Sequence, residues 1–253
     1  MNPILPPRRS TALLLAFATP TFLWTPSAPA QCCDRVLQNQ PRDIGGTSAA
    51  HGAYPWMTAL VERGQTPSKG QFCGAALIAP QWVLPAAHCI EDTTAGRLDV
   101  VVGGDDLREA NGSGQRIEVT QIIRHPSSGE TNGTLSNDLA LLKLAIPTAN
   151  VPLLRLIDSA TRTSSGLPCK GMGFGTTTEG GNTSPMLLHV DLAFVPRSAA
   201  NVVYGGITDA HLGAGIAGGG RNTCQGDSGG ARRHAPSAVG RSRHRAPRAG
   251  SGT

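Results

Sequence analysis

The apolar positions of this chain form short runs that are separated by turn residues. Runs of this length, bounded by Gly, Pro, Asn or Ser, are typical of β-strands. Four of them are predicted strands: Leu98–Val102, Ile117–Thr120, Leu139–Leu144 and His189–Val195. The segment Ser198–Tyr204 fits one or two helical turns, and no longer amphipathic helix stands out in the sequence. The pattern therefore predicts an all-β fold.

Composition agrees with many short strands. The 253 residues include 32 glycines and only 4% aromatic residues, which favours turns over long helices. The net charge is +5, but the segment 231–253 holds six arginines and no acidic residue, and without them the charge becomes −1. The rest of the chain is close to neutral and has no excess of positive charge that would attract nucleic acid, so we expect no nucleic-acid partner. A binder of nucleic acid or membrane surfaces would depend on that basic segment alone.

The beginning of the chain has the pattern of an export signal. Arg8 and Arg9 precede an apolar run from Ala12 to Trp24, and the small residues of 28–30 follow. We expect cleavage after residue 30, a short propeptide or linker over 31–42, and a secreted protein. A membrane helix is the alternative reading, but the apolar run is shorter than the roughly 20 residues that a span requires.

A histidine, His88, lies between two cysteines, Cys73 and Cys89. A bridge between these cysteines would close a loop of about 16 residues and stabilise the fold by roughly 3 kcal/mol. It would also fix the backbone beside His88, as a general base requires. Alone, such a histidine is more often structural. Six cysteines with no CxxC motif and no clustered histidines argue against a metal site.

Two further segments carry candidate chemistry. Asp138 stands at the edge of an apolar strand, where a buried carboxylate needs a partner such as an imidazole N–H. A turn or capping aspartate is the alternative. Ser228 lies within Gly226–Gly230, whose glycines allow the backbone to aim N–H groups at one point, as an oxyanion site requires. A phosphate-binding loop is disfavoured because no lysine follows these glycines.

In the order His88, Asp138, Ser228, these segments resemble the chymotrypsin/trypsin family of serine proteases. The motifs Tyr54-Pro55-Trp56 and Met172-Gly173-Phe174-Gly175 also match that family's pattern. The resemblance implies two six-stranded antiparallel Greek-key β-barrels. It implies hydrolysis of peptide bonds, without a metal or organic cofactor.

The resemblance covers about residues 43–230 and assigns roles within this protease domain. Ser228 would be the nucleophile, His88 the general base and later acid, and Asp138 the group that fixes the imidazole tautomer. Backbone N–H groups of Gly226 and Ser228 would form the oxyanion hole. These roles imply a serine endopeptidase that acts on proteins or peptides, and we expect it to be a monomer. A catalytically inactive homologue that serves as a binding module is the alternative.

The activation segment departs from the family. Its members are zymogens in which a new N-terminus pairs with the aspartate before the nucleophile, here Asp227, so an activating protease is implied. Cleavage after Arg42 would bury the Asp43 carboxylate near Asp227, at a cost of several kcal/mol unless it is paired. Cleavage after Asp43 would begin the chain at Ile44, one residue short.

Two single positions depart as well. Asn222 would form the floor of the substrate pocket, where enzymes that cleave after Arg or Lys carry aspartate. A neutral amide cannot neutralise a buried guanidinium, so we expect a weak preference for basic residues. Pro85 stands where the family usually has threonine, and it cannot donate a ladder hydrogen bond. We expect a local adjustment there.

The largest departure follows Gly230. We find none of the family's later strands in 231–253, which reads as coding sequence in a wrong frame, and we expect a basic, disordered tail. Cys169 and Cys224 correspond to positions whose family partners would lie there. The second barrel is therefore expected to be incomplete, with open edges. A naturally short protease with a basic tail and a non-functional truncated product are the alternatives.

Overall fold

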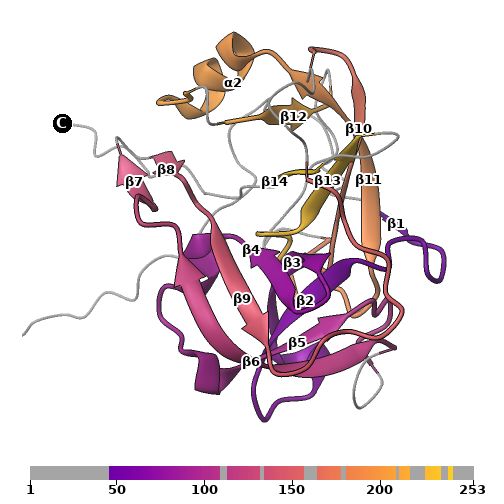
Figure 1. Cartoon of the computed structure of the whole chain (residues 1–253). Helices are drawn as coiled ribbons and strands as arrows, with labels where there is room; N and C mark the ends of the chain where they lie inside the picture. Colours follow the sequence, from indigo (N-terminus) through magenta and orange to yellow (C-terminus); the bar gives the residue numbers. More distant parts are fainter. Residues whose placement is uncertain are drawn as a thin grey trace, which may run out of the picture.

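The computed structural model has two β units that lie against each other (Figure 1). It describes residues 46–108, 113–131, 134–156, 164–177, 181–208, 211–216, 226–234 and 239–241. The predicted export signal, propeptide and activation segment (Arg42, Asp43 and Ile44) lie outside the described residues, as do Asn222 and Cys224.

The first unit is a closed barrel of six antiparallel strands, in the order β2-β3-β4-β9-β6-β5. Its strands are β2 (Met57–Glu62), β3 (Gln71–Ala79), β4 (Trp82–Pro85), β5 (Leu98–Val102), β6 (Gln115–Arg124) and β9 (Ala140–Leu144). β9 alternates buried and half-buried residues, which places Leu142 in the barrel core. β5 is buried along its whole length because all but one of its residues are apolar. The prediction of a six-stranded first barrel is confirmed.

The strands predicted from the apolar runs are present. Leu98–Val102 coincides with β5, and the other three runs lie mainly within β6, β9 and β11 (Leu188–Val195). β6 is longer than its apolar run, because polar residues at both ends still pair with β5 and β9. The predicted helical turns fall in α2 (Arg197–Tyr204), whereas α1 (Pro67–Gly70) is a single turn.

The second unit is a sheet in the order β1-β11-β10-β13-β14, with β12 paired to β11. Its other strands are β1 (Thr47–Ser48), β10 (Pro168–Gly173), β12 (Gly213–Gly215), β13 (Ala231–His234) and β14 (Val239–Arg241). Its core contains Cys169, Val190, Leu192 and Phe194. Among the described residues this sheet is an open path, and the incompleteness of the second barrel stays a prediction.

Two of these strands lie where the sequence predicted a disordered tail. β13 pairs antiparallel with β10, with Cys169 opposite His234, and β14 pairs with β13. Strand pairing joins backbone N–H and C=O groups, so the open edge of β10 can accept a segment whose side chains carry no strand pattern. This part of the segment 231–253 therefore has regular structure in addition to its basic composition.

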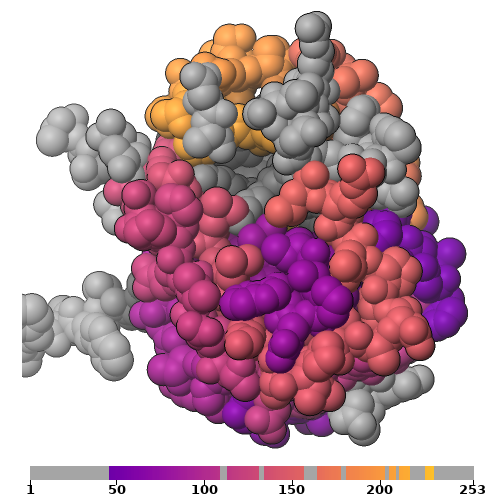
Figure 2. Space-filling model, in the orientation of Figure 1, coloured from indigo at the N-terminus to yellow at the C-terminus, as the bar shows by residue number. Residues whose placement is uncertain are grey.

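The two units contact each other through several hydrogen bonds, and Figure 2 shows them as one body. The Leu107 N–H of the first unit donates to the Pro185 carbonyl at 2.7 Å. The Thr134 hydroxyl, in the hairpin of β7 (Gly129–Thr131) and β8 (Thr134–Ser136), donates to the carbonyl of Gly205 at 3.0 Å. Within the described ranges, no helix is long and apolar enough to cross a membrane.

Candidate active site

His88 lies in a short 3-10 helix, η1 (Ala87–Ile90), that follows β4. Pro85 is the last residue of β4, where a missing N–H interrupts the ladder least, and it still pairs with Ala75 of β3. The predicted bridge between Cys73 and Cys89 is present. It ties η1 to β3 and fixes the backbone next to His88, whose side chain remains 22% exposed.

Asp138 contacts His88 at two points. Its Oδ2 lies 2.8 Å from the His88 Nδ1, and its Oδ1 accepts the His88 backbone N–H at 2.8 Å. The preceding residue, Asn137, has a φ of 46°, which turns the chain just before β9. The Asp138 side chain is only 3% exposed, and these contacts compensate for the desolvation of its carboxylate. They also leave the His88 Nε2 available for another group.

Both Ser228 and the His88 ring lie close to the disulfide sulfur of Cys89. The Cys89 Sγ is 3.6 Å from the His88 Nε2 and 3.6 Å from the Ser228 carbonyl oxygen. That carbonyl also accepts the N–H of Gly74, in β3, at 2.8 Å. The structure thus places the Ser228 backbone beside the disulfide that adjoins His88, and a contact between the Ser228 hydroxyl and His88 stays a prediction.

Glycines on both sides of Ser228 adopt conformations that L side chains rarely adopt. Gly226 has a φ of 91° and Gly229 a φ of 77°. A Cβ atom on Gly226 would lie 2.9 Å from a methyl group of Thr183, and one on Gly229 would lie 2.9 Å from the backbone nitrogen of Ala86. The tight turn around Ser228 therefore requires glycine at both positions.

Asp227 lies at a recess between β10, β11 and the loop Gly226–Gly230, which we name the nucleophile loop after the predicted role of Ser228. Gly46, Thr176 and His189 also line this recess. The Gly175 N–H donates to the Asp227 carboxylate at 2.7 Å. The family resemblance predicts that a new N-terminus pairs with Asp227, and this pairing stays a prediction. The segment that would provide it lies outside the described residues.

Burial lowers the pKa of His189, and the charge of Lys170 lowers it further, against an opposing effect of Asp191. Its Nδ1 is buried without a hydrogen-bond partner among the described residues. The ring packs edge-on against Tyr54, with 5.6 Å between ring centroids. These contacts favour the neutral imidazole.

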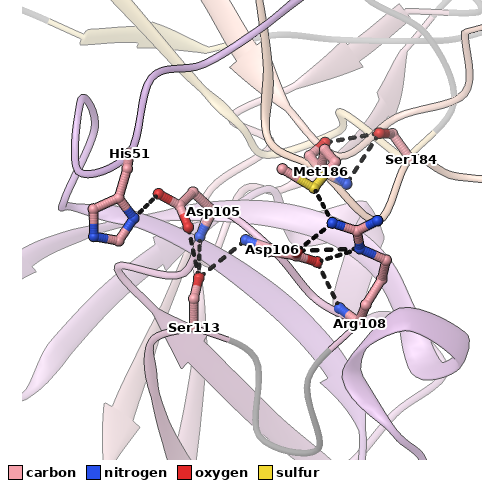
Figure 3. Close-up of polar contacts among 7 residues, drawn as sticks. All are labelled: His51, Asp105, Asp106, Arg108, Ser113, Ser184 and Met186. Carbon is pink, nitrogen blue, oxygen red and sulfur yellow. Dashed lines mark hydrogen bonds and ion pairs between the residues drawn. The ribbon is translucent and has the colours of Figure 1, made fainter.

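A second serine, aspartate and histidine lie together outside the candidate site (Figure 3). The Asp105 carboxylate contacts His51 Nδ1 at 2.7 Å and accepts the Ser113 hydroxyl at 2.7 Å. Burial acts to raise the pKa of Asp105, but hydrogen bonds from Ser113 and Gly52, together with His51, lower it overall. Ser113 bonds the carboxylate rather than the imidazole, so this arrangement cannot activate a nucleophile. It connects the segment before β2 to the loop after β5.

The neighbouring contacts in Figure 3 join that loop to the second unit. Arg108 binds the Asp106 carboxylate at 2.6 Å and lies 3.3 Å from the sulfur of Met186. The Arg108 guanidinium lowers the pKa of Asp106. The Ser184 hydroxyl donates to the Met186 carbonyl at 2.8 Å. These contacts therefore link the loop after β5 to the segment before β11.

Cys73, His88 and Cys89 form a group of potential metal ligands, with ligand atoms within 4.8 Å of one another. The two sulfurs are joined in a disulfide. A metal site of this type needs thiolates, so the chemistry of these donors does not fit one.

Sequence reasoning missed Gln71. Its side-chain amide donates to the carbonyl of Gly226 at 3.1 Å and connects β3 to the nucleophile loop. The signal in the sequence is weak: a single polar residue at the start of an apolar strand, two positions before Cys73.

Comparisons with known proteins agree with this geometry. The sequence model of the family described as Trypsin matches residues 43–242. The chain belongs to the trypsin family. The match continues past Gly230, where the sequence resemblance was expected to end, and includes β13 and β14.

Relatives in the trypsin family cover most of the protease domain. The chain is 32% identical to Serine protease 1 of Rattus norvegicus over 197 residues, which are 77% of this chain and 75% of the relative. It is 33% identical to Trypsin I-P1 of Gallus gallus over 196 residues, which are 76% of this chain and 74% of the relative.

Among solved structures, the VesB protease of Vibrio cholerae is similar with a TM-score of 0.62 and 33% identity. The likeness covers 77% of this chain but only 57% of the VesB chain. This chain therefore spans little more than half of that protease. The all-β serine protease fold predicted from the motifs is confirmed.

Proposed function

We propose that this protein is a secreted serine endopeptidase that acts through His88, Asp138 and Ser228. The observation that carries the proposal is the double contact of Asp138 with His88, which turns the His88 Nε2 toward the disulfide that Ser228 also touches. The trypsin-family membership supports the same chemistry. Its substrates would be proteins or peptides, and the enzyme would act as a monomer.

In the proposed reaction, the Ser228 hydroxyl attacks the carbonyl carbon of the scissile bond while the His88 Nε2 accepts its proton. Asp138 accepts the Nδ1–H hydrogen bond, which keeps the Nε2 unprotonated and stabilises the imidazolium that forms. Backbone N–H groups of Gly226 and Ser228 would bind the developing oxyanion. The leaving amine then takes the proton from His88, and water hydrolyses the resulting acyl-enzyme by the reverse proton path.

Activation would require cleavage near the start of the protease domain, after Arg42 or after Asp43. The new α-ammonium would pair with Asp227, whose carboxylate already accepts the Gly175 N–H at the recess. An anchored Asp227 would in turn order the adjoining Gly226 and Ser228. Export through the signal at residues 1–30 would place this event outside the cytoplasm.

At the substrate pocket, Asn222 would provide a neutral floor. A neutral amide leaves a bound guanidinium without a counter-charge, so arginyl and leucyl substrates should be cleaved at similar rates. A rate for arginyl substrates that is higher by orders of magnitude would contradict this assignment.

The function is tested with two preparations of the protein in which the mature N-terminus begins at Asp43 or at Ile44. Internally quenched peptide libraries should be cleaved by one or both of them, and Ser228→Ala should abolish the cleavage. Ser113→Ala, in the second polar cluster, is the matched control and should retain activity. If folded protein of both lengths cleaves nothing, the chain is a non-catalytic homologue, and peptide binding without cleavage would identify it as a binding module.

A further inference from the structure

Gln71 begins β3 and makes a hydrogen bond across the interface between the two units. Its Nε2 donates to the Gly226 carbonyl at 3.1 Å, although 155 positions separate the two residues. Only one residue separates Gln71 from Cys73, whose disulfide with Cys89 fixes the backbone beside the candidate base. The same short stretch of β3 therefore holds both the histidine and the nucleophile loop.

The free energy of folding does not explain why a polar amide stands at position 71. Gln71 is 6% exposed, and its Oε1 is buried without a hydrogen-bond partner among the described residues. An unsatisfied buried acceptor destabilises the folded state, and an apolar side chain of similar size would avoid this penalty. The hydrogen bond to Gly226 is therefore the specific contribution of this side chain.

The backbone of Gly226 needs a hydrogen bond from outside its own loop to hold its conformation. Its φ of 91° is open only to glycine, and glycine has the largest conformational freedom of all residues. The residues that follow it have their own anchors: Asp227 accepts the Gly175 N–H, and Ser228 accepts the Gly74 N–H. Among the described residues, Gln71 makes the hydrogen bond that orients the peptide between Gly226 and Asp227.

We propose that Gln71 is a positioning residue for the oxyanion hole, an inference that rests on the proposed endopeptidase function. Its amide holds the Gly226 carbonyl, which belongs to the peptide between Gly226 and Asp227, on the side of β3. This contact restrains rotation about the Cα–C bond of Gly226 and so limits how far the Gly226 N–H, which belongs to the preceding peptide, can turn away from the scissile carbonyl. Gln71 touches neither substrate nor reacting atoms. Its loss should weaken transition-state stabilisation and leave ground-state binding of the substrate unchanged.

The test replaces Gln71 by methionine, which keeps the length of the side chain and removes the donor. Loss of a whole oxyanion donor costs about 10²–10³ in kcat, so loss of its positioning should cost roughly tenfold to a hundredfold. KM should stay constant, and the affinity of a peptide aldehyde, which mimics the oxyanion, should fall by the same factor as kcat. Gln71→His offers an N–H donor at similar reach and should restore most of both. Gln71→Leu replaces the methionine variant if the latter does not fold.

Thr58→Val is the matched control. Thr58 is also buried in the first barrel, and its hydroxyl donates to the Trp56 carbonyl at 3.2 Å, away from the nucleophile loop. This variant should lower the melting temperature without changing kcat or aldehyde affinity. The inference is wrong if Q71M retains both values, or if T58V loses them to the same extent.

A second measurement does not depend on activity. Hydrogen exchange followed by mass spectrometry should show faster exchange in Q71M than in the parent protein, confined to the peptide that contains Gly226–Gly230. Unchanged exchange there overturns the role of Gln71. If the parent protein is inactive but Q71M still exchanges faster, the endopeptidase proposal fails while the contact of Gln71 with Gly226 stands.

Discussion

Asp138 holds His88 through both of its carboxylate oxygens, one on the ring Nδ1 and one on the backbone N–H, each at 2.8 Å. The first contact sets the tautomer and the second sets the position of the residue. An amide at this place could keep the position but not the tautomer. In the proposed reaction, the carboxylate would therefore have a chemical role in addition to a structural one.

We expect Asp138→Asn to reduce kcat on the order of 10⁴-fold near neutral pH, because the wrong tautomer leaves the His88 Nε2 protonated. The melting temperature should change little, since the amide can still accept the backbone N–H. Asp106→Asn removes an aspartate that pairs with Arg108 away from the site, and it should keep full activity. Full activity of D138N would rule out Asp138 as the partner of the base.

The lowered pKa of His189 predicts that the free energy of unfolding decreases at acid pH. Burial and Lys170 lower its pKa in the folded state, so the unfolded chain binds the proton first as the pH falls below about 6.5. The free energy of unfolding should therefore decrease from that pH down to the folded-state pKa of His189. His189→Phe keeps the edge-on contact with Tyr54 and removes the titration. Urea unfolding at several pH values should give a flatter profile for the variant, and an identical profile would contradict the prediction.

The pairing of β10 with β13 can be tested by a crosslink. Cys169 lies opposite His234, and directly opposed residues of antiparallel strands lie within the Cα separation that a disulfide accepts, about 4.4–6.8 Å. We expect His234→Cys to form a bridge with Cys169 under oxidising conditions and to stabilise the protein by about 4 kcal/mol. Arg233→Cys, whose Cα lies opposite Lys170 rather than Cys169, is the control.

Non-reducing peptide mapping by mass spectrometry identifies this bridge. Its absence in H234C, or an equal yield in R233C, would show that residues 231–234 do not pair with β10 in this register. The basic segment would then be a tail from its first residue, as the sequence alone suggested.

Much of the site is accessible to sequence reasoning because its information is local. Three motifs can be recognised from a few neighbouring residues each. They are the cysteines that bracket His88, the aspartate before an apolar strand and the glycines around Ser228. The same holds for β5, whose apolar run has the length of the strand.

Two features could not be read from the sequence because their cause is distant. Gln71 looks like an ordinary polar residue at a strand end until the fold brings Gly226 beside it. β13 has no apolar pattern, since its pairing depends on the edge of β10 and on backbone groups that every residue carries. The activation segment and Asn222 stay predictions.

The most direct test of the central claim is covalent labelling by a fluorophosphonate, which reacts with a serine only where a base and an oxyanion site activate it. The probe is applied to folded protein with the mature N-terminus, and the modified peptide is identified by mass spectrometry. We predict a single label on Ser228, absent in S228A and strongly reduced in His88→Ala. Folded protein that stays unlabelled at Ser228 would contradict the assignment of this chain as a serine endopeptidase.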